Sequence, residues 1–345
     1  MRRRQGSRTV VITGATSGIG EATAYAFARQ GAHLVLAARN GDALDDVARR
    51  CRSLGAREAL AVPTDVTSVD SVMQLAARAR SLGRGIDVWF SNAGVGAVGA
   101  FHETPMAAHQ QVIQTNLVGH MHDAYAALPI FLRQGHGIFI NMISLGAFAP
   151  APFATAYSAS KYGLSGFSAA LRGELREHPD IHVCDVYPSF IDTPGLRHGA
   201  NYVGRALTAP PPVYDARRVA RAVVRLADRP RPTTVVGSFA HLARLGHALA
   251  PELGTRLLAM AMQAYFRRAE RVPVTDGNLF APPREPGGID GGLRRPGARY
   301  MTVLAAALVA GGVAALLMGG RRSHPGGRSR PLTAPSRNGG IRRMT

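Results

Sequence analysis

The sequence predicts an α/β fold in which a parallel sheet of about seven strands is covered by helices on both faces. Short apolar runs alternate with longer amphipathic stretches over the first 240 residues, which is the order of repeated β-α-β units. The runs are apolar at almost every position, as expected for strands buried on both faces. A glycine-rich turn follows the first run. These observations together predict a doubly wound, Rossmann-like sheet that binds a nucleotide.

The seven short apolar runs are the expected strands. They lie at Thr9–Thr13, His33–Ala38, Ala59–Pro63, Ile86–Ser91, Gly137–Ile143, Ile181–Tyr187 and Thr233–Gly237. The segments between them place apolar residues at helical spacing. The expected helices are Ile19–Gln30, Ala43–Leu54, Val69–Leu82, Ala107–Leu132, Ala156–Glu177 and Asp215–Ala227. Strand, helix and strand in this order form right-handed crossovers, so the strands should run parallel.

The chain changes character after the last expected strand. Phe239–Arg268 is an apolar helical stretch broken near Pro251. We expect it to pack as core, and a surface lying on a bilayer is the alternative. Residues 273–299 are rich in proline and glycine and indicate a linker. The expected organisation is a nucleotide-binding domain at 1–240, a C-terminal helical extension at 241–272 and this linker.

No charged residue lies between Met301 and Gly320. As a helix, this stretch would be about 30 Å long, which is the thickness of the hydrocarbon core of a bilayer. We therefore expect a single transmembrane helix at 300–320, followed by a basic disordered tail at 321–345. A hydrophobic tail helix that does not span a membrane is the alternative. Arginines flank the stretch on both sides, so the positive-inside rule gives no orientation.

The net charge of +19 would suit nucleic acid or an anionic membrane as a partner. The basic residues crowd at the two ends, however, and no nucleic-acid recognition motif accompanies them, so we expect no nucleic-acid partner. Cys51 and Cys184 are the only cysteines, which is too few for a disulfide framework and fits a reducing compartment. The expected location is a membrane anchor with the main domain in the cytoplasm.

The glycine-rich turn runs from Thr13 to Gly20, between the first expected strand and helix. Glycines there let the backbone approach a pyrophosphate, whose charge is met by free N–H groups and the helix dipole. Arg39 follows the second expected strand, and no acid lies between the end of that strand and Asp42. NAD sites place an acid at this point to bind the ribose 2′-hydroxyl, whereas an arginine accommodates a 2′-phosphate. The sequence therefore predicts NADP(H) as the cofactor.

Lys161 is the only lysine in the chain, and it follows Tyr157 by four residues. At that spacing the two share one helix face. Ser144 follows the fifth expected strand, where its hydroxyl could hold a carbonyl or alcohol oxygen. A tyrosine is too weak a base at pH 7, but a nearby ammonium lowers its pKa. These residues predict a proton-transfer site, and a coding bias that leaves one lysine by chance is the alternative.

These motifs, in this order and spacing, resemble those of the short-chain dehydrogenase/reductase family over about residues 7–240. The resemblance implies a catalytic tetrad in which Asn116, supporting the lysine through water, joins Ser144, Tyr157 and Lys161. With Arg39, the implied cofactor contacts are Thr13, Gly14, Ser17, Gly18, Ile19, Gly20, Asp65, Asn92, Ala93, Gly94, Tyr157, Lys161, Pro188, Ile191 and Thr193. Ser91 and Ser189 depart from the family pattern, and Ser189 replaces a glycine, which leaves the conformation of the loop after the sixth strand open.

The predicted function is NADP(H)-dependent hydride transfer between nicotinamide and a secondary alcohol or ketone. Aromatic residues near the segments that border the family's substrate cleft favour an apolar substrate, with plain core packing as the alternative. They are Phe101, Phe148, Phe153 and Phe190. The family is commonly dimeric or tetrameric, so the resemblance implies a homodimer or homotetramer.

Two other functions stay open. One is a membrane-tethered NADP-binding scaffold without turnover, and the other is an epimerase or dehydratase on the same fold. No metal site is expected, because His120 and His122 are not at metal-binding helical spacing and no cysteine or acid cluster joins them.

Overall fold

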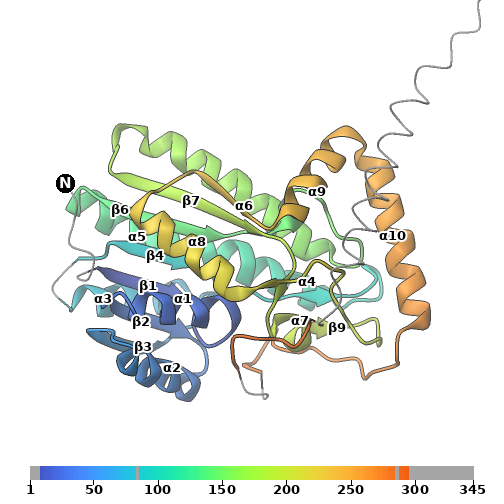
Figure 1. Ribbon diagram of the computed structural model, residues 1–345, viewed down its shortest axis with the longest axis horizontal. Helices are drawn as coiled ribbons and strands as arrows, with labels where there is room; N and C mark the ends of the chain where they lie inside the picture. Colours follow the sequence, from blue (N-terminus) through green and yellow to red (C-terminus); the bar gives the residue numbers. More distant parts are fainter. Residues whose placement is uncertain (1–7, 83–84, 284–286, 295–345) are drawn as a thin grey trace, which may run out of the picture. The chain divides into compact units, whose positions relative to one another are not determined.

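The computed structural model describes residues 8–82, 85–283 and 287–294. Its centre is a seven-stranded sheet in the order β11-β7-β6-β4-β1-β2-β3 (Figure 1), with every neighbouring pair parallel. The strands are β1 (Thr9–Thr13), β2 (His33–Ala38), β3 (Glu58–Pro63), β4 (Val88–Ser91), β6 (Gly137–Met142), β7 (Ile181–Pro188) and β11 (Thr233–Val236). All seven predicted strands are confirmed, with ends that differ from expectation by two residues at most.

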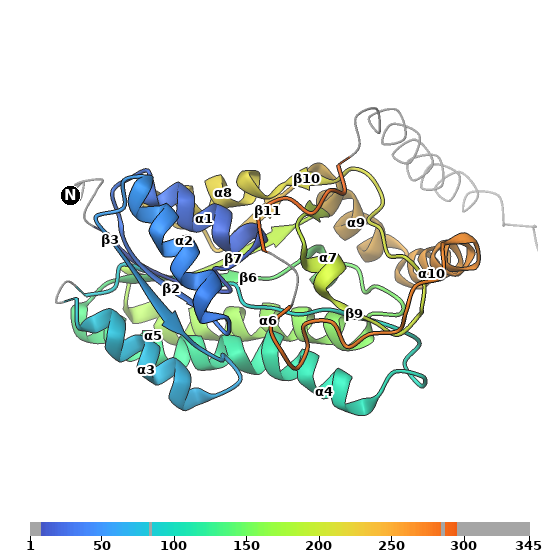
Figure 2. The ribbon, with the colours of Figure 1, turned by 90° about the horizontal axis from the view of Figure 1, so that it is seen from below.

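Helices cover both faces of the sheet, as Figure 2 shows. One face carries α1 (Gly18–Ala28), α2 (Gly41–Ser53) and α8 (Ala216–Asp228), and the other carries α3 (Val69–Arg80), α5 (Gly119–Gln134) and α6 (Thr155–Glu174). Asn40, Ser68 and Asp215 begin α2, α3 and α8 by accepting a backbone N–H with the side chain. Such N-caps satisfy donors that have no partner within the helix.

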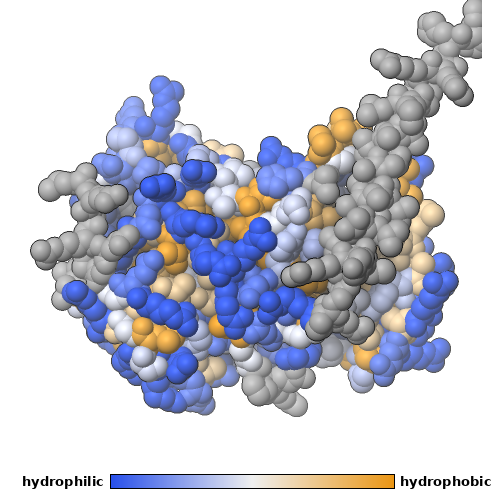
Figure 3. Space-filling model, viewed as in Figure 1, coloured by the Kyte–Doolittle hydropathy of each residue, from blue (hydrophilic) through white to orange (hydrophobic). Residues whose placement is uncertain are grey.

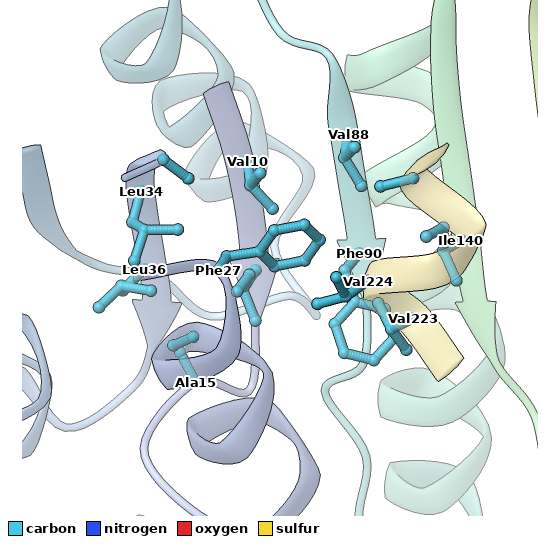
Figure 4. Close-up of a cluster of buried hydrophobic side chains, with 14 of the residues drawn as sticks. Val10, Ala15, Phe27, Leu34, Leu36, Val88, Phe90, Ile140, Val223 and Val224 are labelled. Atoms are coloured by element: carbon cyan, nitrogen blue, oxygen red, sulfur yellow. The ribbon is translucent and has the colours of Figure 1, made fainter. Parts of the chain in front are cut away.

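The larger buried cluster lies between the sheet and α1 and α8 (Figure 4). Phe27 of α1 projects over the sheet among Val10, Leu34 and Phe90, and all four side chains are fully buried. Burying one side chain of this size contributes about 2 kcal/mol. Phe27 lies in the last turn of α1, and Val10 and Leu34 lie near the beginnings of their strands, so this packing holds the C-terminal end of α1 against the sheet.

The predicted helix Ala107–Leu132 is interrupted. The structure divides it into α4 (Met106–Ile113), a π-helical turn (Gln114–Val118) and α5. Such turns are rare and occur often at functional sites. Asn116 lies in the middle of this one.

Short elements complete the carboxyl end of the sheet. Two small parallel pairs join β5 (Ala97–Val98) to β9 (Ala200–Asn201) and β8 (Ile191–Asp192) to β10 (Tyr214–Asp215). The remaining short helices are α7 (Gly195–His198) and the 3₁₀ turns Leu145–Ala147 and Leu175–Glu177.

After the last strand the chain forms α9 (Ser238–Leu249) and α10 (Pro251–Arg268), and the second helix begins at Pro251. The expectation that this stretch packs as core is wrong for α10, which has no buried residue. Leu249, Leu257 and Met260 are more than half exposed, at 61%, 55% and 61%. Figure 3 shows hydrophobic side chains gathered on the surface at the bend between the two helices.

The expected linker at 273–299 is also different in its described part. Residues 273–283 and 287–294 lie along the carboxyl end of the sheet, and Leu279 has no exposed surface. Over the described residues, no helix has both the length and the apolar character needed to cross a membrane. The predicted transmembrane helix at 300–320 and the predicted tail at 321–345 lie outside the described residues.

Candidate active site

The site lies at the carboxyl ends of β1, β4 and β6. The chain leaves β1 toward β2 on one side of the sheet and later returns to β4 on the other. Doubly wound sheets bind their ligands where the strand order reverses in this way.

The glycine-rich turn is shaped by three glycines. Gly14 and Gly18 have positive φ angles of 66° and 54°, which few other residues adopt. A Cβ added to Gly20 would lie 2.0 Å from the carbonyl oxygen of Gly14. The turn is therefore a tight cradle at the N-terminus of α1, whose backbone N–H groups are the kind of donor that a phosphate group binds. Ser17 precedes that helix and Ile19 lies half-buried in its first turn.

The cradle is tied to the segment after β4. The hydroxyl of Thr13 accepts the Asn92 N–H at 3.1 Å, and the Asn92 amide donates to the carbonyl oxygens of Thr13 and Gly14. Ala93 lies against Gly14, since a Cβ added to Gly14 would be 2.9 Å from the Ala93 Cα. Gly94 leaves space for Asn116, whose Oδ1 would be 3.3 Å from an added Cβ.

Arg39 lies immediately after β2, as predicted. Its guanidinium faces the chain's own C-terminal segment, donating to the carbonyl oxygens of Asn278 and Leu279 at 2.6 and 3.1 Å. The nearby Asp65 carboxylate raises the pKa of the guanidinium, although burial lowers it more. The Asp65 carboxylate also accepts two hydrogen bonds from Thr67. A cation here and a glycine cradle nearby are the donor set that a dinucleotide with a 2′-phosphate needs.

Ser144, Tyr157 and Lys161 come together at the carboxyl end of β6. Ser144 follows the strand, and its hydroxyl accepts the Gly146 N–H at 3.1 Å. Tyr157 and Lys161 lie one turn apart on α6, with the Lys161 Nζ 5.8 Å from the centre of the Tyr157 ring. A Cβ added to Gly146 would lie 3.2 Å from the tyrosine ring. The glycine thus lets the phenol approach the serine.

Burial controls the proton affinity of this group. It raises the pKa of the Tyr157 phenol, and a hydrogen bond with Ser144 lowers that pKa only in part. It lowers the pKa of the Lys161 ammonium to about 7. In this structure the Lys161 ammonium donates to the carbonyl oxygen of Met142 at 2.9 Å, and the lowering of the phenol pKa by Lys161 stays a prediction. The phenol stays protonated at pH 7 and can act as an acid.

Asn116 is brought to the site by the π-helical turn. Its carboxamide accepts the Val95 N–H at 2.8 Å and donates to the Val95 carbonyl oxygen at 2.9 Å. It also lies 3.4 Å from the Ser160 hydroxyl. The side chain thus holds the loop after β4, and its part in a proton relay stays a prediction.

The loop after β7 carries the remaining predicted contacts. Pro188 ends the strand, Ile191 belongs to β8, and Thr193 lies against Gly18, with its Cβ 3.0 Å from a Cβ added there. Ser189 fits the loop in place of the family's glycine, because its hydroxyl donates to the Gly237 carbonyl oxygen and accepts the Ala240 N–H.

Two buried polar residues behind the site were not predicted. Asp123 accepts hydrogen bonds from Thr13 at 3.0 Å and Ser91 at 2.6 Å, and burial raises its pKa to about 7. His120 lies between Asn141 and the carbonyl oxygen of Ala93, and burial lowers its pKa to about 4. Both lie one or two turns beyond Asn116 on α5, which is the only signal the sequence offered.

Across the described residues, no three His, Cys, Asp or Glu side chains form a group that could hold a metal ion. Cys51 and Cys184 are both buried as free thiols.

Comparison with known proteins places this arrangement in a family. A family profile described as short chain dehydrogenase matches residues 8–200. The chain is 31% identical over 267 residues to the uncharacterized oxidoreductase YxnA of Bacillus subtilis, covering 76% of this chain and 74% of that protein. It is 32% identical over 268 residues to 11-beta-hydroxysteroid dehydrogenase 1A of Arabidopsis thaliana, covering 73% and 76%. The crystal structure of a metagenomic short-chain oxidoreductase in complex with NADP superimposes with a TM-score of 0.57 and 28% identity, covering 68% of this chain and 98% of that one. With the glycine cradle and the Ser144–Tyr157–Lys161 group in place, the chain belongs to the short-chain dehydrogenase/reductase family of oxidoreductases.

Proposed function

We propose that this chain is an NADP(H)-dependent oxidoreductase that interconverts a ketone and a secondary alcohol. The observation that carries the proposal is the meeting of Ser144, Tyr157 and the buried Lys161 beside the glycine cradle. Arg39 follows β2, and the next acid in the sequence is Asp42, which supports NADP(H). The NADP complex of a similar oxidoreductase supports it too. When bound, the nicotinamide supplies or accepts the hydride.

The residues of the chain handle the proton. In the direction of reduction, the Tyr157 phenol gives its proton to the carbonyl oxygen as the alcohol forms, while the Ser144 hydroxyl orients that oxygen. The raised pKa of the phenol suits this direction, because the acid is present at pH 7. The Lys161 ammonium stabilises the phenolate that is left and binds the ribose hydroxyls of the cofactor. A water held at Asn116 would relay a proton from solvent to Lys161, and from Lys161 to the phenolate, which restores the Tyr157 hydroxyl.

An apolar substrate is the second part of the proposal. Two of the predicted aromatic residues pack against the C-terminal helices: Phe153 contacts Phe266 of α10 edge-on at 5.3 Å, and Phe190 lies 5.9 Å from Phe239 of α9. A third, Phe148, stacks on Tyr187 at 4.4 Å. Aromatic side chains thus connect the segments after β6 and β7 to α9 and α10. A relative named as a hydroxysteroid dehydrogenase supports a substrate of this character.

A membrane tether is the third part. The uncharged stretch at 301–320 carries this proposal, and the exposed leucines of α9 and α10 agree with it (Figure 3). The catalytic domain would then work in the cytoplasm beside the bilayer, where apolar carbonyl compounds partition. A homodimer or homotetramer stays a prediction.

The test is a screen of ketones, aldehydes and alcohols with the full-length protein, in which NADPH oxidation and NADP reduction are followed at 340 nm. The proposal expects turnover of apolar carbonyl compounds, faster with NADPH than with NADH. A protein that binds NADPH but turns over nothing in the panel would favour a scaffold. Isomerised or dehydrated product without net change in NADPH would favour an epimerase or dehydratase.

A further inference from the structure

The C-terminal segment lies on the residues that the cofactor needs. Its described parts, residues 276–283 and 287–294, are here called the strap. They follow α10 and run beside α7 and β9 and then past β10 (dark orange in Figure 2). Composition alone would make this segment a free linker, so its close contact with the crevice calls for a function.

The first part of the strap holds Arg39. The guanidinium donates to the carbonyl oxygens of Asn278 at 2.6 Å, Leu279 at 3.1 Å and Ala281 at 3.4 Å. Gln111 donates to the same Leu279 oxygen at 3.2 Å. Both terminal nitrogens of Arg39 are therefore engaged by neutral peptide oxygens at the place where a 2′-phosphate would bind.

The second part holds the glycine cradle. The Gly18 N–H, at the N-terminus of α1, donates to the Gly288 carbonyl oxygen at 2.9 Å. A Cβ added to Gly287 would lie 2.4 Å from the Thr16 carbonyl oxygen, and one added to Gly291 would lie 2.1 Å from that of Thr193. Only glycines let the strap lie this close to the loops that would contact the pyrophosphate and the nicotinamide.

The strap is anchored at both ends. Leu279 is fully buried in a cluster with Val95 and Val112, against which Tyr157 also packs. At the other end, Arg294 binds Asp192 at 2.9 Å and Asp290 at 2.7 Å. The charges of that end therefore form a latch on the loop after β7.

Arg217 of α8 completes the latch by pairing with Asp290 at 2.8 Å. The two pairs of Asp290 are 40% or more exposed on both sides, so each is weak and can open in water, whereas the Asp192 carboxylate that Arg294 binds is only 3% exposed. An anchor of this kind holds the strap without fixing it permanently.

We propose that the strap is a built-in competitor of the cofactor: it occupies the dinucleotide crevice of the cofactor-free chain and must leave Arg39 and Gly18 before NADP(H) binds. The inference rests on the proposed cofactor. Phosphate oxygens are stronger acceptors for a guanidinium and a helix N-terminus than peptide oxygens are, so the cofactor can win the exchange. Only chains with an open strap bind the cofactor, so the apparent affinity for NADP(H) equals the intrinsic affinity multiplied by the fraction of chains that are open.

The experiment compares the full-length protein with a latch variant, Asp290→Ala/Arg294→Ala, and a matched control, Glu252→Ala/Arg256→Ala. The control removes an exposed acid–arginine pair, also four residues apart, from α10. Leu279→Ala, which removes the buried anchor, is a second opening variant. NADPH affinity is measured by fluorescence titration, and docking of the strap by hydrogen–deuterium exchange of its peptides without cofactor.

We expect slow exchange of strap peptides in the wild type and the control, and faster exchange in both opening variants. The opening variants should bind NADPH about fivefold more tightly, and saturating NADPH should speed strap exchange in the wild type. Weaker NADPH binding by both opening variants, or slower strap exchange with NADPH, would mean that the strap is a lid over the cofactor and would overturn the proposal. Unchanged affinity in a variant whose strap exchanges fast would also overturn it. If no variant binds NADPH although the strap is protected, the proposed cofactor itself is wrong.

Discussion

The ammonium of Lys161 donates a 2.9 Å hydrogen bond to the carbonyl oxygen of Met142, the last residue of β6. Only 4% of this lysine is exposed, and burial lowers its pKa to about 7. In the cofactor-free chain, Lys161 is therefore charged below that pH and neutral above it. A group poised in this way makes binding to the site depend on pH.

NADPH affinity of the wild type should fall as the pH rises through about 7, because the neutral amine is a weaker donor to the ribose hydroxyls. In Lys161→Met this dependence should be absent. The titration of the 2′-phosphate is common to both proteins, so the ratio of their dissociation constants at each pH, measured by fluorescence titration, isolates the lysine. If the ratio of the two NADPH dissociation constants stays constant from pH 6 to 8.5, the pH dependence does not come from Lys161.

Lys161→Arg tests whether a cation of another shape will serve. The site is closed around Nζ, and an added guanidinium must displace its neighbours at a cost of about 1–3 kcal/mol. We expect turnover to fall by about tenfold or more, with a melting temperature that is also lower. Near-normal activity of Lys161→Arg would mean that the site does not require a lysine, and that the single lysine of the sequence is a result of chance.

Arg39→Asp should move preference from NADPH toward NADH, since a carboxylate repels the 2′-phosphate and accepts a ribose 2′-hydroxyl. The substitution also removes the strap's contacts with Arg39, but that change affects both cofactors equally. The measurement is therefore the ratio of the two dissociation constants. An unchanged ratio would show that the end of β2 does not choose the cofactor.

Asp123→Asn should change how stability depends on pH. The carboxyl has a folded pKa of about 7 and an ordinary value of 3.8, so the folded chain holds its proton more tightly than the unfolded chain. This group therefore contributes stability that is fully present below about pH 4 and is lost as the pH rises through about 7. Urea unfolding of both proteins from pH 4 to 8 should show the variant gaining stability relative to the wild type by up to about 3–4 kcal/mol. A constant difference over that range would refute the raised pKa.

Removal of residues 295–345 should release the protein from the membrane fraction, because the uncharged stretch at 301–320 is lost. The truncated protein retains the whole strap and should bind NADPH as the full-length chain does. Fractionation of lysates after a salt wash compares the two. A truncated protein that stays with the membrane as the full chain does would disprove the anchor.

The sheet and the catalytic group were predictable because their signals are local. Each strand is a short apolar run, and Tyr157 and Lys161 are one helical turn apart on any helix that contains them. The position of the strap could not be predicted, because its contacts join residues that are far apart in the sequence, such as Arg39 and Leu279, which are separated by 240 positions. Its glycines are typical of a flexible linker, yet they are also the only residues that fit against Thr16 and Thr193. Likewise, the spacing of apolar residues in α10 could not show whether these side chains pack against the rest of the protein or stay exposed.

Replacement of Tyr157 by phenylalanine tests the central claim most directly, because it removes only the hydroxyl that would transfer the proton. On any carbonyl substrate found with NADPH, we expect kcat to fall by about 10²-fold or more, while NADPH affinity measured by titration stays within about twofold. Turnover comparable to the wild type, with the cofactor bound normally, would contradict the account.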